Sequence, residues 1–151
     1  MLKPILLVED NPKDLELSLL ALEKSNLANE VITVRDGKEA LDYLLREGTF
    51  AGRDKGNPAV ILLDLKMPKL DGLQVLQRIK SEPSLQTIPV VMLTTSREEK
   101  DLVRSYELGV NAFVVKPVAF EPFISAIQDL GVFWAVVNEP PPGSAKTGTR
   151  G

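Results

Sequence analysis

Four short apolar runs recur along this chain, and each one ends in a chemically reactive polar residue. Buried strands of a parallel sheet are continuous apolar runs of this length, and the chain returns between two parallel strands through a crossover, usually a helix. The alternation therefore predicts an α/β domain in which the carboxyl ends of the strands meet at one edge of the sheet. The runs and the residues that follow them are Ile5–Val8 with Glu9 and Asp10, Val60–Leu63 with Asp64, Val90–Leu93 with Thr94, and Ala112–Val115 with Lys116.

A fifth apolar run, Val31–Val34, and five amphipathic stretches complete the predicted fold. Asn11 is a favourable N-cap residue, and Pro12 fits the first position of a helix. Five strand–helix units predict a doubly wound, five-stranded parallel sheet of order 2-1-3-4-5, with a ligand site between strands one and three. The predicted helices run from Asn11 to about Lys24, over Asp36–Arg46, from Asp71-Gly72, from Ser96 to Gly109, and from Pro122 to about Val137. Three leucines of the first helix share one face: Leu15, Leu19 and Leu22.

The 151 residues are enough for one domain with a substantial core. We expect this domain to cover residues 1–137 and to be followed by a flexible tail, residues 138–151, which is rich in proline and glycine. The segment Glu47–Pro58 contains three glycines among charged residues and is predicted to be an exposed loop.

Composition excludes several classes of function. The net charge is −3 and the basic residues are scattered, which argues against nucleic acid as the main partner. The chain has no cysteine and no histidine, so disulfides, thiolate metal sites and histidine catalysis within this chain are excluded. No apolar run reaches the roughly 18 residues that a membrane-spanning helix needs. A cytoplasmic location is therefore the default expectation.

The residues at the strand ends suit phosphoryl transfer. Carboxylates placed close together repel one another, and a hard divalent cation with oxygen ligands relieves that repulsion. An aspartate in such a site can also act as a nucleophile that forms an acyl phosphate. Taken alone, Asp64 would be read as an ordinary strand-end aspartate, but its pairing with Glu9 and Asp10 favours the chemical role.

Several blocks, in the correct order, resemble the CheY-like receiver domains of two-component signalling, which have the flavodoxin-like strand order given above. The resemblance extends from residue 3 to about residue 131. The blocks are Leu6-Leu7-Val8-Glu9-Asp10-Asn11, Leu63-Asp64-Leu65-Lys66-Met67-Pro68 with Asp71-Gly72, Leu93-Thr94-Thr95, and Val114-Val115-Lys116-Pro117.

This resemblance implies a phosphoacceptor and a magnesium site. Asp64 corresponds to the phosphoacceptor of the family. Asp10 and Asp64 correspond to residues that bind Mg²⁺ directly, the main-chain carbonyl of Lys66 adds a ligand, and Glu9 acts through water. The implied protein is a signalling phosphoacceptor that contributes to its own phosphorylation and dephosphorylation, and not an enzyme in the usual sense.

The resemblance also implies residues that respond to phosphorylation. Lys116 corresponds to the lysine that pairs first with the phosphoacceptor and then with a phosphoryl oxygen, and the family has a cis bond between this residue and Pro117. Thr94 corresponds to the hydroxyl residue that turns toward the phosphoryl group. Phe113 occupies the aromatic switch position, although a permanently buried strand residue is an equal alternative for it.

The last predicted helix carries more apolar residues than one packed face requires. Ile124, with Phe133 and Val136, leaves apolar surface on a second side, and such a patch usually marks an interface. This end of the chain and the segment Glu47–Pro58 resemble the single-domain response regulators associated with phytochromes, which commonly form homodimers through this face. The resemblance implies a histidine kinase partner, with a phytochrome-type kinase as the candidate, and a homodimer. The expected interface residues are Phe133, Trp134, Val136 and Val137.

Two other functions remain open at this stage. One is a scaffold that keeps the receiver shape and binds partners without phosphorylation, although the complete acidic set with Lys116 counts against it. The other is a Mg²⁺-dependent phosphatase with an aspartyl-phosphate intermediate. Phosphatases of the haloacid dehalogenase type carry a second aspartate two residues after the nucleophile, and here Lys66 occupies that position.

Overall fold

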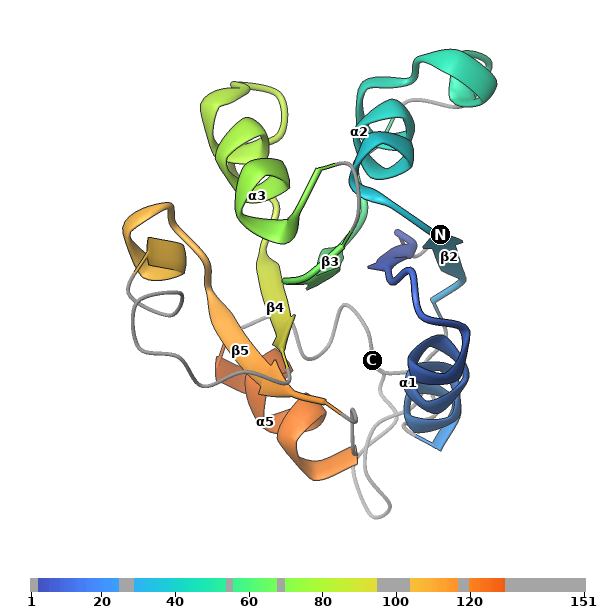
Figure 1. Ribbon diagram of the computed structural model, residues 1–151, viewed down its shortest axis with the longest axis vertical. Helices are drawn as coiled ribbons and strands as arrows, with labels where there is room; N and C mark the ends of the chain where they lie inside the picture. The colour runs from blue at the N-terminus through green and yellow to red at the C-terminus, as the bar shows by residue number, and fades with distance from the viewer. Residues whose placement is uncertain are drawn as a thin grey trace, which may run out of the picture.

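Five parallel strands form a single sheet in the computed structural model (Figure 1). The structure describes residues 3–24, 29–53, 56–67, 70–94, 104–116 and 120–129. The strand order is β2-β1-β3-β4-β5, which confirms the predicted doubly wound fold. The strands are β1 (Ile5–Val8), β2 (Val31–Val34), β3 (Val60–Asp64), β4 (Val90–Thr94) and β5 (Ala112–Val115).

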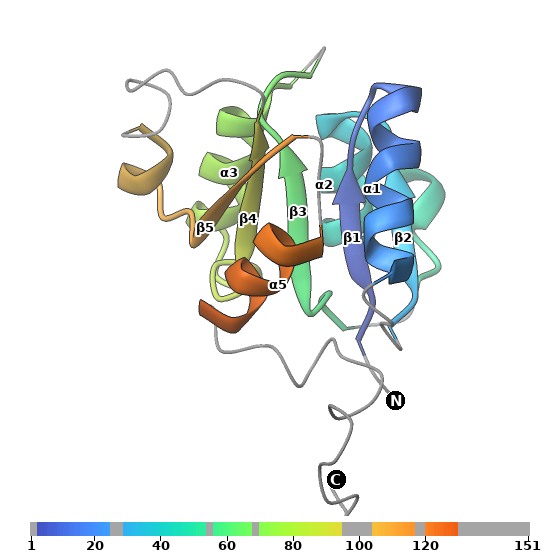
Figure 2. The same cartoon turned by 90° about the horizontal axis from the view of Figure 1, so that it is seen from below.

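Helices cover both faces of the sheet, so the three central strands β1, β3 and β4 are fully buried, whereas the edge strands β2 and β5 are only partly buried. Helices α2 and α3 lie on one face, and α1 and α5 lie on the other, in front of the sheet in Figure 2. Each face therefore has its own cluster of buried side chains. The helices are α1 (Pro12–Lys24), α2 (Gly37–Leu45), α3 (Gly72–Ser81) and α5 (Phe120–Asp129). Residues 104–107 are also helical.

Polar side chains begin three of these helices. Asn11 Oδ1 accepts hydrogen bonds from the backbone N–H groups of Lys13 and Asp14, at 2.9 and 3.0 Å, which confirms the predicted N-cap of α1. Asp36 caps α2. Asp71 and Gln74 form a reciprocal capping box at the start of α3. These caps satisfy N–H groups that have no partner within the helix.

Three predictions about helix positions were wrong in detail. Leu19 was expected on the buried face of α1, but it is 37% exposed. The buried residues of α1 are Ser18, Ala21 and Leu22, which share the face of the helix that packs on the sheet. Helix α5 begins at Phe120, two residues before the predicted start at Pro122. Ile124 packs against the buried cluster under α1 and α5, so it does not contribute to a free apolar surface.

Most described residues between Glu47 and Pro58 are exposed, as predicted, but part of this segment is helical rather than a loop. It contains a short helix, η1 (Gly48–Phe50), and the Phe50 ring packs edge-on against Tyr43 with centroids 5.2 Å apart. The Arg53 guanidinium lies over the Tyr43 ring, 4.1 Å from the ring centroid. Its Nε–H group donates to the Tyr43 carbonyl oxygen at 2.9 Å. These contacts fasten the segment to α2.

Some predictions lie outside the described residues. They concern the peptide bond to Pro117, the start of a helix at Ser96, the interface residues from Phe133 to Val137, and the tail of residues 138–151. In the described part of the chain, no helix is both long enough and apolar enough to cross a membrane.

Candidate functional site

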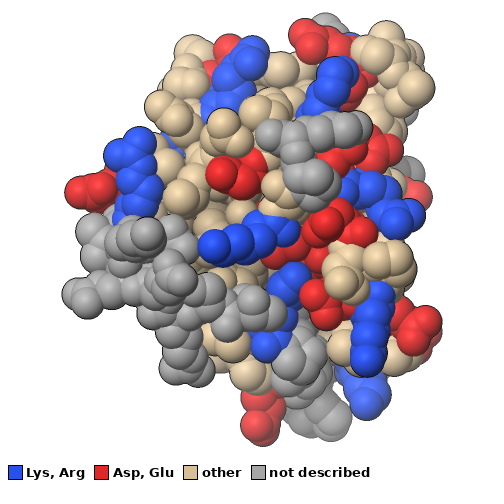
Figure 3. Space-filling model, viewed as in Figure 1, with Lys and Arg blue, Asp and Glu red and all other residues tan. Residues whose placement is uncertain are grey.

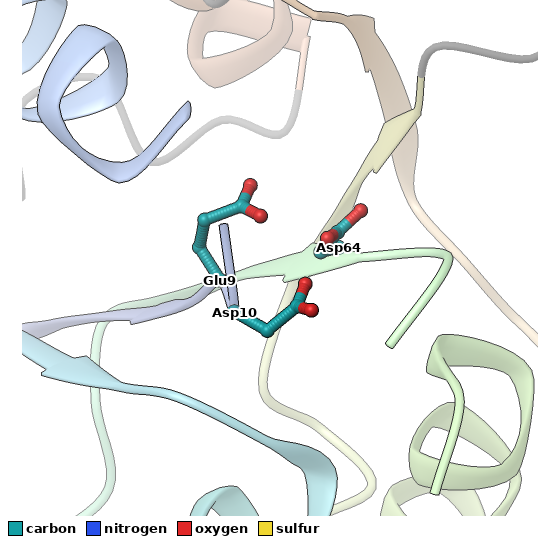
Figure 4. A group of neighbouring side chains, drawn as sticks. All are labelled: Glu9, Asp10 and Asp64. Atoms are coloured by element: carbon teal, nitrogen blue, oxygen red, sulfur yellow. The ribbon is translucent and has the colours of Figure 1, made fainter. Parts of the chain in front are cut away.

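The sheet register brings the first two groups of acidic residues together. Strands β1 and β3 are parallel neighbours in which Val8 pairs with Leu63, so Glu9 and Asp64 follow at the same level. The carboxylates of Glu9, Asp10 and Asp64 converge between the two strand ends (Figure 4), and one oxygen from each lies within 4.8 Å of the others. Strand β3 extends one residue further than predicted, which makes Asp64 its last residue.

The turn after Asp64 depends on Gly72. The Gly72 N–H donates to the Leu65 carbonyl oxygen at 2.9 Å, so the start of α3 is fastened to the end of β3. A Cβ atom on Gly72 would lie 2.5 Å from the Asp64 carbonyl oxygen and 2.8 Å from the Leu65 Cα atom. Both neighbours are backbone atoms that cannot move aside, so only glycine permits this approach.

Lys116 brings a positive charge to the same point. It follows β5, and its backbone N–H donates to the Thr94 carbonyl oxygen at 2.9 Å. Its Nζ atom lies 3.0 Å from Glu9 Oε1, 3.0 Å from Asp14 Oδ2 and 3.2 Å from Asp64 Oδ1. The ammonium therefore donates hydrogen bonds to Glu9 and Asp14 and forms an ion pair with Asp64. The lysine side chain is only 7% exposed, so these pairs are largely screened from water.

The electrostatics of the site favour binding of a cation. Burial raises the pKa of the Asp64 carboxyl to about 7, and the neighbouring Glu9 adds to this effect against the influence of Lys116. Burial alone would lower the pKa of Lys116, but its ion pairs with Asp14, Glu9 and Asp64 outweigh burial and raise it. The single ammonium does not compensate the buried carboxylates, so a proton or a metal ion at Asp64 would relieve their repulsion.

The donor set fits a small hard cation. All three side chains offer carboxylate oxygens, the ligand type that Mg²⁺ prefers. Asp10 is only partly buried, which leaves a route for solvent and ligands. Acidic and basic side chains lie side by side near the middle of this face (Figure 3). Lys66 has an exposed side chain, and its backbone N–H points to Asp64 Oδ1 at 3.4 Å.

The two candidate switch residues lie on the neighbouring strands. Thr94 is buried at the end of β4, one residue beyond the partner of Asp64 in the sheet register. Phe113 in β5 is half-buried and packs against one of the two core clusters. Its ring contacts the exposed Tyr106 edge-on, with centroids 5.1 Å apart. The two rings line a surface groove of about 390 Å³ between β5 and α5.

Sequence reasoning missed Asp14. This residue is in the first turn of α1, next to the N-cap Asn11, and its position suggested only a favourable charge near a helix N-terminus. In the structure it is one of the three carboxylates that hold Lys116. No local pattern could have revealed this contact, because the two residues are 102 positions apart in the chain.

Comparisons with known proteins agree on one family. The family model described as "Response regulator receiver domain" matches residues 5–128. The bacteriophytochrome response regulator RtBRR is 70% identical in its solved structure, with a TM-score of 0.85 over 95% of this chain and 87% of that chain.

Two curated relatives are more distant. The probable methanogenesis regulatory protein FilR2 of Methanothrix harundinacea is 43% identical, over 91% of this chain and 86% of its own length. Response regulator Rcp1 of Synechocystis is 42% identical, over 87% of this chain and 88% of its own length. A solved structure of Rcp1 is described as its Mn²⁺-bound form and has a TM-score of 0.73 over 88% of this chain and 94% of that chain, at 41% identity.

Proposed function

The chain belongs to the response regulator receiver family, and on that premise we propose that Asp64 accepts a phosphoryl group from a partner histidine kinase. The observation that carries the proposal is the position of Asp64. Its carboxylate lies between an acidic cluster that suits a divalent cation and the ammonium of Lys116, which is 3.2 Å away. Phosphorylation then shifts the protein between two conformations, and a partner reads the difference.

The proposed metal ion is Mg²⁺, held directly by Asp10 and Asp64 and through water by Glu9, with the main-chain carbonyl of Lys66 as a further ligand. The carboxylate chemistry of the cluster and the Mn²⁺-bound form of Rcp1 support this assignment. When bound, the ion supplies positive charge that offsets the negative charge of an incoming phosphoryl group.

In the transfer step, one carboxylate oxygen of Asp64 forms a bond to phosphorus. The bond between phosphorus and the imidazole nitrogen of the kinase breaks, and its electron pair stays on the imidazole. Lys116, whose ammonium is paired with Asp64 Oδ1 before the transfer, is then able to donate to a phosphoryl oxygen. Later attack of water on phosphorus releases inorganic phosphate and restores the Asp64 carboxylate.

We propose that Thr94 and Phe113 carry the signal away from Asp64. The Thr94 hydroxyl turns toward the phosphoryl oxygens, and Phe113 moves inward as the end of β4 shifts. The half-buried position of Phe113 at the wall of a surface groove supports this role, because a ring that is partly exposed can become more buried when it moves. In this proposal the bond between Lys116 and Pro117 is cis.

The outer face of α1 offers a docking surface for the kinase. Leu19 and Leu20 are 37% and 46% exposed and line a groove of about 380 Å³ that begins at Pro12, beside the phosphoacceptor site. The residues that line this groove are spaced three or four positions apart along α1, so a second helix could pack along it. We propose that a helix of the kinase binds here and presents its phosphohistidine to Asp64.

The similarity to RtBRR supports a bacteriophytochrome-type kinase as the partner. We also propose a cytoplasmic homodimer, in which the receiver domain covers residues 1–137 and contributes Phe133, Trp134, Val136 and Val137 to the interface. In this proposal residues 138–151 form a flexible tail.

Intact-protein mass after incubation with acetyl phosphate and Mg²⁺ tests the central proposal. We expect a gain of one phosphoryl group that requires Mg²⁺ and is absent in Asp64→Asn. If acetyl phosphate fails, a histidine kinase donor is the second test. Failure of both donors would support the phosphorylation-independent scaffold.

A further inference from the structure

Lys116 has three carboxylate partners, and one of them has no part in the proposed transfer. Glu9 and Asp64 belong to the acidic cluster that suits a cation. Asp14 comes from a different element, the first turn of α1, and its Oδ2 atom lies 3.0 Å from Lys116 Nζ. Among the described residues, the cation cluster consists of Glu9, Asp10 and Asp64, so Asp14 is the partner of Lys116 that lies outside it.

We propose that Asp14 is a positioning residue that holds the ammonium of Lys116 beside Asp64 while the phosphoryl group is transferred. This inference rests on the proposed function. The contact between Lys116 and Asp64 Oδ1 must change when an Asp64 oxygen binds phosphorus. Glu9 is expected to be shared with the metal ion. The contact to Asp14 is the one that the reaction leaves unaltered.

The need for such a contact follows from the nature of lysine. Its side chain is long and loses much rotational freedom when it is held in one place. A donor that is already in position when negative charge develops stabilises that charge without further reorganisation. During the transfer Asp64 is bonded to phosphorus and Glu9 is shared with the metal ion. Without Asp14, Lys116 would then have no carboxylate partner that stays in place.

The N-cap of α1 fixes the position of Asp14. The Asp14 N–H donates to Asn11 Oδ1 at 3.0 Å, and the Asn11 N–H donates to Glu9 Oε2 at 3.2 Å. One short segment therefore places two acceptors of the Lys116 ammonium. Helix α1 itself is held against the sheet by buried residues such as Leu22. The Asp14 side chain is 28% exposed, so its replacement should not create a buried cavity.

Phosphorylation kinetics with two charge-matched variants test the proposal. Asp14→Asn keeps the shape of the side chain and removes its charge. Glu16→Gln removes the same charge from an exposed position of the same helix. Glu16 lines the groove proposed for the kinase, but acetyl phosphate donates without a kinase, so this groove does not enter the measurement. At saturating Mg²⁺ and acetyl phosphate, we expect Asp14→Asn to lower the maximal phosphorylation rate by about three- to tenfold, from the strength of a charge-assisted hydrogen bond. Glu16→Gln should leave this rate unchanged.

The dependence on donor concentration separates positioning from charge. Removal of a negative charge near the site favours an anionic donor, so it would lower the half-saturating concentration of acetyl phosphate and leave the maximal rate unaltered. Loss of positioning lowers the maximal rate. Asp14→Glu, which retains the carboxylate, should recover most of the rate. A maximal rate for Asp14→Asn equal to or above that of Glu16→Gln would overturn the proposal.

A second measurement does not depend on phosphorylation. The ammonium protons of a buried, paired lysine exchange slowly enough to give an NMR signal in ¹⁵N-labelled protein, and Lys116→Arg would assign it. We expect this signal in the unmodified protein and in Glu16→Gln, and its loss in Asp14→Asn. A signal unchanged in Asp14→Asn would contradict the inference. If neither the unmodified protein nor any variant is phosphorylated, the proposed function fails. The ammonium signal then decides by itself whether Asp14 holds Lys116.

Discussion

The charge on Asp64 is expected to destabilise the metal-free protein above pH 7, so Asp64→Asn should be more stable there. The pKa of this carboxyl is raised from 3.8 to about 7, first by burial and then by Glu9. Between these two pH values the folded protein holds a proton that the unfolded chain has released. The free energy of unfolding therefore falls as the pH rises from about 4 to about 7, and it is level above that range.

The size of the effect follows from the same shift. About three pKa units correspond to about 4 kcal/mol at a pH above both values. Asparagine removes this cost, but it weakens the contact with Lys116, which is now 3.2 Å from Asp64 Oδ1. We therefore expect a net gain of about 2 to 4 kcal/mol, which corresponds to a rise in the urea midpoint of about 1 to 2 M.

Urea unfolding followed by circular dichroism would measure this gain. The variant and the unmodified protein should be compared at pH 8 and pH 5 with a chelator present, and at pH 8 with Mg²⁺. The gain should be large at pH 8 in chelator and about a third as large at pH 5, where most of the fall in stability between the two pKa values has yet to occur. Mg²⁺ should also reduce it, because the ion stabilises the unmodified site. Glu16→Gln, on the exposed side of α1, controls for net charge. Equal or lower stability of Asp64→Asn at pH 8 in chelator would refute the reasoning.

Three further substitutions test the turn at Gly72, the charge of Lys116 and the contacts of Arg53 outside the site. Gly72→Ala should lower stability by about 2 to 3 kcal/mol and impair phosphorylation, because its Cβ would lie 2.5 Å from the Asp64 carbonyl oxygen; Gly52→Ala, in open space, should change neither property in the same unfolding and mass measurements. Lys116→Met should strengthen Mg²⁺ binding on the order of tenfold by calorimetry, because it removes a like charge from the site, and unchanged or weaker binding would contradict this. Arg53→Ala should lower stability by about 1 to 2 kcal/mol through loss of its contacts with Tyr43, yet leave the phosphorylation rate unaltered.

Local signals in the sequence were sufficient for most of the fold. Each strand contains a short, mostly apolar run, and the cap residues Asn11 and Asp71 mark the starts of α1 and α3. The sequence was less reliable in predicting which apolar residues of a helix face the core. In α1 the close approach of the helix to the sheet favours Ser18 and leaves Leu19 outside, although leucine is the more apolar residue.

By itself, the sequence determined that reactive side chains stand at strand ends. Parallel strands share their direction, so Glu9, Asp64 and Lys116 reach the same edge of the sheet whatever the details of packing.

Only the tertiary structure decided which of these groups touch and what else joins them. Lys116 has its third carboxylate partner in Asp14 because α1 begins and β5 ends beside the same site, although the two residues are 102 positions apart. Arg53 likewise lies over Tyr43 by virtue of the folded segment between them. Patterns of hydrophobicity describe each element separately, whereas such contacts arise from the distance and angle between elements, which packing sets.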